Sequence, residues 1–140
     1  MAEKKLFELR TDGGARGNPG PAGAGGWLKD PATGEIVDQF SLYLGERTNN
    51  QAEYEALVEG LRRAKKHGAT SVACFLDSEL LVEQMSGRYK VKNKELASLF
   101  VKAWNLKTEI GNVTFRHIPR ELNKEADHLV NKAIDRAIRQ

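Results

Sequence analysis

The 140-residue sequence lacks several features that would place it in a special class of protein. It has a single cysteine, Cys74, so an intrachain disulfide is excluded, and the apolar neighbours of this residue predict a small core side chain. No apolar run is long enough to cross a bilayer, and the first residues lack the apolar segment of a signal peptide. Repeats, low-complexity tracts and linkers are absent as well. We therefore expect one soluble, cytoplasmic domain over residues 1–140 that does not contact a membrane.

The composition permits a normal core and gives a weak indication of the partner. A hydrophobic content of 40% over this length is enough for one sizeable core but not for two ordinary domains. The 22 basic and 19 acidic residues leave a net charge of +3, with a sequence pI near 9.0. Such a balance is compatible with an anionic partner such as nucleic acid but does not require one.

The first third of the chain has the pattern of β-strands. Residues 5–12, 23–29 and 35–44 have strand-like patterns, and stretches rich in glycine and proline separate them. We expect three antiparallel strands with a hairpin loop at residues 30–34. Residues 13–21 contain so many glycines that a long loop is predicted there.

From residue 50 onward the apolar spacing is mainly that of helices, which alternate with short strands. A helix is predicted from residue 50 to Gly68, where the glycine ends it. The later elements are a strand at residues 72–76, a helix capped by Ser78 that runs to Met85, a helix from Asn93 to Gly111, a strand at residues 113–117 and a helix from about Asn123. The sequence thus predicts an α+β domain whose five-stranded mixed sheet is covered by helices.

Four of the 19 acidic residues occupy positions that ordinary surface charges rarely occupy. Asp12 and Asp77 each end a predicted strand, whereas Glu53 and Asp127 lie near the start of a predicted helix, beside its apolar stripe. Singly, each acid could be a turn residue or could complement a helix dipole. Clustered carboxylates, however, repel one another unless a cation neutralises them, and hard oxygen ligands favour Mg²⁺ or Mn²⁺. Two such ions would suit cleavage of a phosphodiester.

The segments around these acids resemble those of one known family. They are TDGG at residues 11–14 with GNPG at residues 17–20, RTNNQAE at residues 47–53, LDS at residues 76–78 and NKEAD at residues 123–127. In this order and spacing they are similar to type I ribonuclease H, and the resemblance extends from Leu6 to Ala137. It lies closer to the archaeal and bacterial branch without a basic protrusion.

The resemblance implies a ribonuclease H-like fold with sheet order 3-2-1-4-5 and a specific activity. It implies an endonuclease that uses two Mg²⁺ ions, or Mn²⁺ as a substitute, to cut the RNA strand of an RNA/DNA hybrid. The products would carry a 5' phosphate and a 3' hydroxyl. Asp12, Glu53, Asp77 and Asp127 match the family's metal ligands. The simplest expectation is a monomer with no obligate protein partner.

The resemblance also implies a set of substrate contacts. Backbone groups of Gly13, Gly14 and Ala15 would approach the hybrid closely, and contacts to 2'-hydroxyls would distinguish RNA from DNA. The side chains that match substrate-contacting positions are Asn18, Asn49 and Gln51, together with Thr48 and Asn93 at a pocket for a phosphate of the DNA strand. Helix capping is an alternative role for Thr48, Asn49 and Asn93, and the two roles are compatible.

Two segments depart from the best-known members. Residues 86–94 are short where those members carry an extra helix and a basic protrusion, so Arg88, Lys90, Lys92 and Lys94 either replace it in part or form a solvated turn. We expect weaker affinity for the hybrid.

The second departure concerns the histidine that the family places on a mobile loop to assist catalysis. Alignment without gaps places His117 there, but this residue ends a predicted strand, and Arg120 in the following loop is an equal candidate. His67 and His128 are expected at the surface. Trp27 and Trp104 are expected in the core.

Two other functions compete with the active nuclease. A hybrid-binding module without activity is disfavoured because all four carboxylates are present. A resolvase or transposase domain of the wider superfamily is disfavoured because those proteins lack the GNPG loop and the helix start at residues 48–53. The sequence leaves open whether the domain is free-standing or part of a larger protein.

Overall fold

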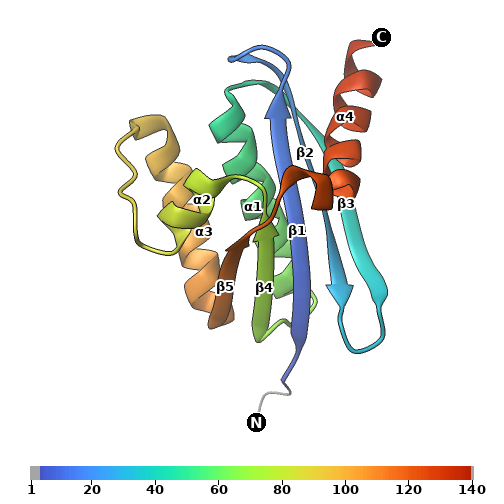
Figure 1. Ribbon diagram of the computed structural model, residues 1–140, viewed down its shortest axis with the longest axis vertical. Helices are drawn as coiled ribbons and strands as arrows, with labels where there is room; N and C mark the ends of the chain where they lie inside the picture. Colours follow the sequence, from blue (N-terminus) through green and yellow to red (C-terminus); the bar gives the residue numbers. More distant parts are fainter. Residues whose placement is uncertain (1–3, 140) are drawn as a thin grey trace.

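Five strands form one mixed sheet in the computed structural model, which describes residues 4–139 (Figure 1). The strands are β1 (Leu6–Ala15), β2 (Gly20–Asp30), β3 (Glu35–Arg47), β4 (Ser71–Leu76) and β5 (Asn112–His117). They lie in the order β3-β2-β1-β4-β5, in which β1 to β3 are antiparallel and β4 is parallel to both β1 and β5. The expected α+β class and strand order are confirmed.

The helices pack on both faces of this sheet. They are α1 (Asn49–Lys66), α2 (Glu79–Met85), α3 (Lys94–Ile110) and α4 (Lys124–Ile138), with a 3-10 turn at Arg120–Leu122. The main core lies between the sheet and the helices α1, α2 and α3, and it includes Leu9, Leu57, Leu61, Leu76 and Met85. Helix α4 packs on β1, β2 and β3 (Figure 1). Within residues 4–139, no helix has the length and apolar character needed to cross a membrane.

The predicted loop at residues 13–21 is confirmed only for residues 16–19, because strand β1 continues to Ala15 and β2 already begins at Gly20. Asp12, which was expected to end the first strand, therefore lies within β1. Gly13 and Gly25 serve close packing of helices onto the sheet and do not break the strands. A Cβ atom on Gly13 would lie 2.1 Å from the carbonyl oxygen of Ala52 in α1, and one on Gly25 would lie 2.6 Å from that of Ala126 in α4. Strand pairing between Gly13 and Ala24 is therefore kept while α1 sits directly against β1.

Three of the four predicted helix starts are confirmed by side-chain caps, whereas α4 begins after Asn123 without one. Thr48 Oγ1 accepts a hydrogen bond from the Gln51 amide, and the Gln51 side chain accepts one from the Thr48 amide. Ser78 accepts from the Leu81 amide, and Asn93 accepts from the Glu95 amide. Each cap satisfies a backbone donor that the helix itself leaves free.

The predictions for the other aromatic and sulfur side chains have mixed outcomes. Cys74 and Trp27 are buried as expected. Trp104 is not a core residue: its side chain is 38% exposed and packs beside Phe100, with the Lys107 ammonium 4.5 Å from a Trp104 ring centroid. Trp104 lies at the flank of the apolar face of α3, where an indole ring can be only partly buried.

The two histidines expected at the surface also differ. His128 is exposed, whereas His67 is half-buried and its Nε2 lies 3.1 Å from an Asp38 carboxylate oxygen. The C-cap position of His67 on α1 brings it against strand β3.

Candidate active site

Three of the four singled-out carboxylates converge at one edge of the sheet. Asp12 lies in the last half of β1, Asp77 directly follows β4, and Glu53 lies in the second turn of α1. Since β1 and β4 are parallel neighbours, their carboxyl ends meet at the same edge. One carboxylate oxygen from each residue lies within 4.8 Å of the other two.

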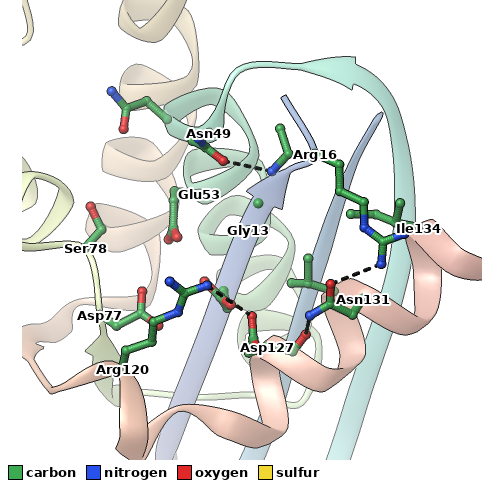
Figure 2. Close-up of a pocket in the computed structure, with 15 residues that line it drawn as sticks. Gly13, Arg16, Asn49, Glu53, Asp77, Ser78, Arg120, Asp127, Asn131 and Ile134 are labelled. Carbon is green, nitrogen blue, oxygen red and sulfur yellow. Dashed lines mark hydrogen bonds and ion pairs between the residues drawn. The ribbon is translucent and has the colours of Figure 1, made fainter. Parts of the chain in front are cut away.

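The packing of α1 explains why Glu53 reaches the two strand ends. The contact of Gly13 with the Ala52 carbonyl seats the first turns of α1 against β1, beside Asp12. Figure 2 shows Glu53 and Asp77 in the same cleft, which has a volume of about 520 Å³ and which Asp12 and Gly13 also line.

The electrostatics of these three residues, the carboxylate trio, are unfavourable without a cation. Burial, with added repulsion from Asp77 and Asp127, raises the pKa of the Asp12 carboxyl from 3.8 to about 7. Burial and then the charge of Asp12 raise the pKa of Glu53 well above its ordinary value. Glu53 Oε2 is buried and has no hydrogen-bond partner among the described residues. An unpartnered carboxylate oxygen beside two further acids is a set of donors that fits a hard divalent cation, so the trio could bind one.

Asn123, which the sequence suggested only as a helix start, proves to support Asp77. Its Nδ2 donates to Asp77 Oδ2 at 3.2 Å and to the Thr11 carbonyl at 3.0 Å, and the residue is 1% exposed. Burial raises the pKa of Asp77, and this hydrogen bond acts against that rise. The only signal in the sequence was an asparagine at a helix start close to a candidate acid, because nothing in the periodicity places its side chain inward.

Asp127 lines the same cleft from the opposite wall, on α4 (Figure 2). Its side chain is 35% exposed, and its Oδ1 lies 3.9 Å from Arg120 Nη2. It does not belong to the group of three whose oxygens lie within 4.8 Å of one another. The cleft thus contains all four predicted acids: three lie close together, and Asp127 on the facing helix is near enough to Asp12 to contribute to the raised pKa of that carboxyl.

The structure separates the two candidates for the assisting residue. Arg120 lines the cleft, and its guanidinium is 81% exposed beside Asp127. His117 is exposed at the end of β5, paired in register with Leu76, and it is not among the residues that line the cleft. Arg120 and His117 both act to lower the pKa of Asp77, and the effect of Arg120 is the larger.

The loop that carries Arg120 is tied to the sheet by Arg10. The Arg10 guanidinium lies 5.3 Å from ring centroids of both Trp27 and Phe75, and its Nη1 donates to the Leu122 carbonyl at 2.5 Å. These contacts fix the turn that positions Arg120 and Asn123 at the cleft.

The expected substrate-contacting residues fall into two adjoining pockets. Gly13, Gly14, Ala15 and Asn49 line the cleft, and Asn49 Oδ1 accepts a hydrogen bond from the Ala15 amide at 2.9 Å. The second pocket is lined by Asn18, Thr48, Asn49, Asn50, Gln51, Asn93, Glu95 and Leu96.

This second pocket contains both residues expected to bind a phosphate, Thr48 and Asn93, which also cap α1 and α3. Glu95 was not predicted there, and its Oε2 lies 3.4 Å from Gln51 Nε2. Ser78, Arg16 and Asn131 also line the main cleft without having been predicted.

The segment between α2 and α3 is short, as expected, and contains no further helix. Arg88 is not available as a free cation, because its guanidinium pairs with both Glu83 carboxylate oxygens at 2.6 and 2.8 Å. Lys90, Lys92 and Lys94 are exposed.

Comparison with known proteins identifies the family. The sequence model of the family described as reverse transcriptase-like matches residues 10–133. The structure of LC11-RNase H1, isolated from compost by a metagenomic approach, has 48% sequence identity and a TM-score of 0.89, covering 97% of this chain and 99% of that one. This chain belongs to the type I ribonuclease H family. A second structure of LC11-RNase H1 is a complex with an RNA/DNA hybrid.

Other ribonucleases H are similar over nearly the whole chain. RNase H1 of the halophilic archaeon Halobacterium salinarum is 36% identical with a TM-score of 0.89, covering 93% of this chain and 98% of that one. The bifunctional protein Rv2228c of Mycobacterium tuberculosis is 45% identical over 131 residues. These cover 92% of this chain but only 35% of Rv2228c, whose N-terminal RNase H domain has the same fold, with a TM-score of 0.90. The chain therefore spans about a third of its mycobacterial relatives.

Proposed function

We propose that this protein is a metal-dependent endoribonuclease that hydrolyses the RNA strand of RNA/DNA hybrids. The observation that carries this proposal is the carboxylate trio of Asp12, Glu53 and Asp77 in an open cleft, with Asp127 on the facing wall. Membership of the type I ribonuclease H family and the hybrid complex of LC11-RNase H1 support the choice of substrate.

The trio would hold one Mg²⁺, and Asp127 together with Asp12 would hold a second when the hybrid is bound. Mn²⁺ would substitute for Mg²⁺ because it accepts the same oxygen ligands. When bound, the ions supply Lewis acidity at the scissile phosphate and lower the pKa of water. The expected products are a 5' phosphate and a 3' hydroxyl.

The remaining residues of the cleft bind and orient the hybrid. The strand backbone at Gly13, Gly14 and Ala15 is open to close approach, and Asn49 fixes the Ala15 amide. Asn123 orients the Asp77 carboxylate through its amide. Arg120 is the assisting residue that the geometry favours, since its guanidinium already lies beside Asp127 at the mouth of the cleft.

The second pocket would take a phosphate of the DNA strand. Its uncharged polar side chains, Asn18, Thr48, Gln51 and Asn93, surround one hollow next to the cleft. Hydrogen bonds from these side chains suit a phosphate oxygen.

The test is a cleavage assay with labelled RNA/DNA hybrid, duplex DNA and duplex RNA, each with Mg²⁺, Mn²⁺ or chelator. We expect cleavage of the RNA strand of the hybrid only with metal present, and fragments that carry 5' phosphates. Folded protein that leaves the hybrid uncut under every metal condition would contradict the proposal. Hybrid binding without cleavage would indicate the non-enzymatic module instead.

A further inference from the structure

A row of basic side chains follows the outer face of α4, away from the carboxylate trio. It consists of Lys124, His128, Lys132 and Arg136, spaced four residues apart, and Arg139 at the end of the helix. A four-residue step advances about 6 Å along a helix and returns to nearly the same face, so the side chains form a continuous line. We refer to these five residues as the basic row.

The basic row is exposed, and two acids lie near it. The pKa of Asp135 is lowered by its hydrogen bond with Arg16 and, in smaller part, by Arg139. Glu125 lines one hollow with Lys124, His128 and Lys132. All five residues are exposed, and within residues 4–139 none of them forms a side-chain hydrogen bond or ion pair. Four lysine and arginine charges thus lie along one exposed helix face.

The basic row adjoins the cleft through one residue. Asn131 lines the cleft and also a shallow pocket bordered by His128, Lys132, Asp135, Arg136 and Arg139. The acid in that pocket is already neutralised, since Asp135 Oδ1 lies 2.7 Å from Arg16 Nη1. Figure 2 shows Arg16 reaching across to Asn131, which its Nη2 contacts at 3.2 Å.

The position of the basic row relative to the other pocket indicates which strand it could meet. The proposed pocket for a DNA-strand phosphate shares Asn49 and Asn50 with the cleft, on the α1 side. The basic row meets the cleft on the α4 side, at Asn131. The carboxylate trio lies between the second pocket and the basic row. Because the second pocket is assigned to the DNA strand, the RNA strand held at the trio is the strand nearer to the basic row.

We propose that the basic row binds backbone phosphates of the RNA strand where this strand continues beyond the cleavage site. The proposal rests on the function proposed above. Each lysine or arginine would neutralise one phosphate and release a counterion, which gives affinity that falls with salt. This helix face would therefore supply part of the electrostatic affinity that the short segment at residues 86–94, with Arg88 held by Glu83, does not.

The test compares two double variants with the same change in charge. Lys132→Gln with Arg136→Gln alters the basic row, whereas Lys4→Gln with Lys66→Gln removes two exposed charges at the other end of β1 and α1. Affinity is measured in chelator, where no cleavage occurs, for a short blunt hybrid and for the same hybrid with a single-stranded extension of either the RNA or the DNA.

We expect an RNA extension to increase the affinity of the native protein and of the Lys4/Lys66 variant, but not that of the Lys132/Arg136 variant. At 0.1 M salt the loss for that variant should be roughly tenfold or more, and the slope of log K against log salt should fall by about 1 to 2. Circular dichroism and the unfolding midpoint show whether both variants are folded.

Two results would overturn the proposal. One is an equal loss of affinity in both double variants, which would reflect net charge alone. The other is a gain from the DNA extension instead of the RNA extension, which would assign the basic row to the other strand. Because binding is measured without metal, either result can be told apart from a failure of the cleavage assay.

Discussion

The two walls of the cleft hold their acids in different ways. On one wall, Asp12, Glu53 and Asp77 are buried or half-buried at the ends of β1 and β4 and on α1, with their oxygens within 4.8 Å of one another. On the other wall, Asp127 lies on α4 with a 35% exposed side chain, beside the exposed guanidinium of Arg120.

The difference indicates that the two walls contribute differently to the proposed site. The carboxylate trio is fixed by the sheet and by the contact of Gly13 with α1, and its unpartnered oxygen at Glu53 is suited to a cation. Asp127 and Arg120 are more exposed than Asp12 of the trio. In the proposed metal site, the trio would be the preformed part, and Asp127 on α4 would complete it.

The largest expected effect follows from breaking the trio. Asp12→Asn removes one charge from the position closest to both other acids, and cleavage should fall by about a thousandfold or more, because metal-ion catalysis is worth several kcal/mol. Hybrid binding in chelator should survive the change. Single-turnover cleavage and a binding titration measure the two quantities, and cleavage at the native rate would refute the assignment.

A somewhat smaller effect is expected when the trio is displaced without altering any acid. The new Cβ in Gly13→Ala would meet the Ala52 carbonyl at 2.1 Å and push α1, with Glu53, away from Asp12. A displacement near 1 Å can cost about a hundredfold in rate. Gly14→Ala should displace α1 much less, since its Cβ would meet only Val130 Cγ1 at 3.7 Å, so any loss should be in hybrid binding and not in the rate at saturating hybrid. The rates of the two variants are compared well below their unfolding midpoints, and equal losses would contradict this account.

Substitutions at the turn before α4 should reduce turnover less than substitutions in the trio. Arg120→Ala removes a charged group at the mouth of the cleft, and turnover should fall by about tenfold, the value of a charge-assisted hydrogen bond. His117→Ala should change turnover little, because His117 does not line the cleft. Steady-state kinetics on a hybrid give both values, and the reverse order would return the assisting role to His117.

The remaining effect concerns stability in the absence of metal. The raised pKa of Asp12, about 7 instead of 3.8, means that the folded protein keeps a proton that the unfolded chain releases. The folded state therefore binds more protons between about pH 4 and 7, and stability falls as the pH rises through this range. Urea unfolding in chelator at pH 5 and pH 7 measures this loss. Asp12→Asn should reduce it, and an unchanged pH dependence would argue against a strained trio.

The sequence predicted the carboxylate trio better than it predicted the loop bounds and the side-chain contacts around the trio. Asp12 and Asp77 follow from strand periodicity, and Glu53 from helix phase, because these patterns depend on local burial. Gly13 suggested a loop, since its close contact with α1 involves a partner far away in the sequence. The contacts of Asn123 were out of reach for the same reason, because they depend on how the turn before α4 lies across β1. Arg120 was predicted as one of two candidates for the assisting residue, but the choice between it and His117 also depends on where that turn lies.

Binding of Mn²⁺ followed by electron paramagnetic resonance, without substrate, tests the central claim most directly. We expect the native protein to bind Mn²⁺, and the Asp12→Asn protein to lose this binding while its unfolding midpoint in chelator stays the same or rises, because repulsion within the trio is relieved. Loss of binding with Asp127→Asn should be weaker, since Asp127 lies outside the trio. Native-like Mn²⁺ affinity in the Asp12→Asn protein would contradict the claim that the trio is the metal site.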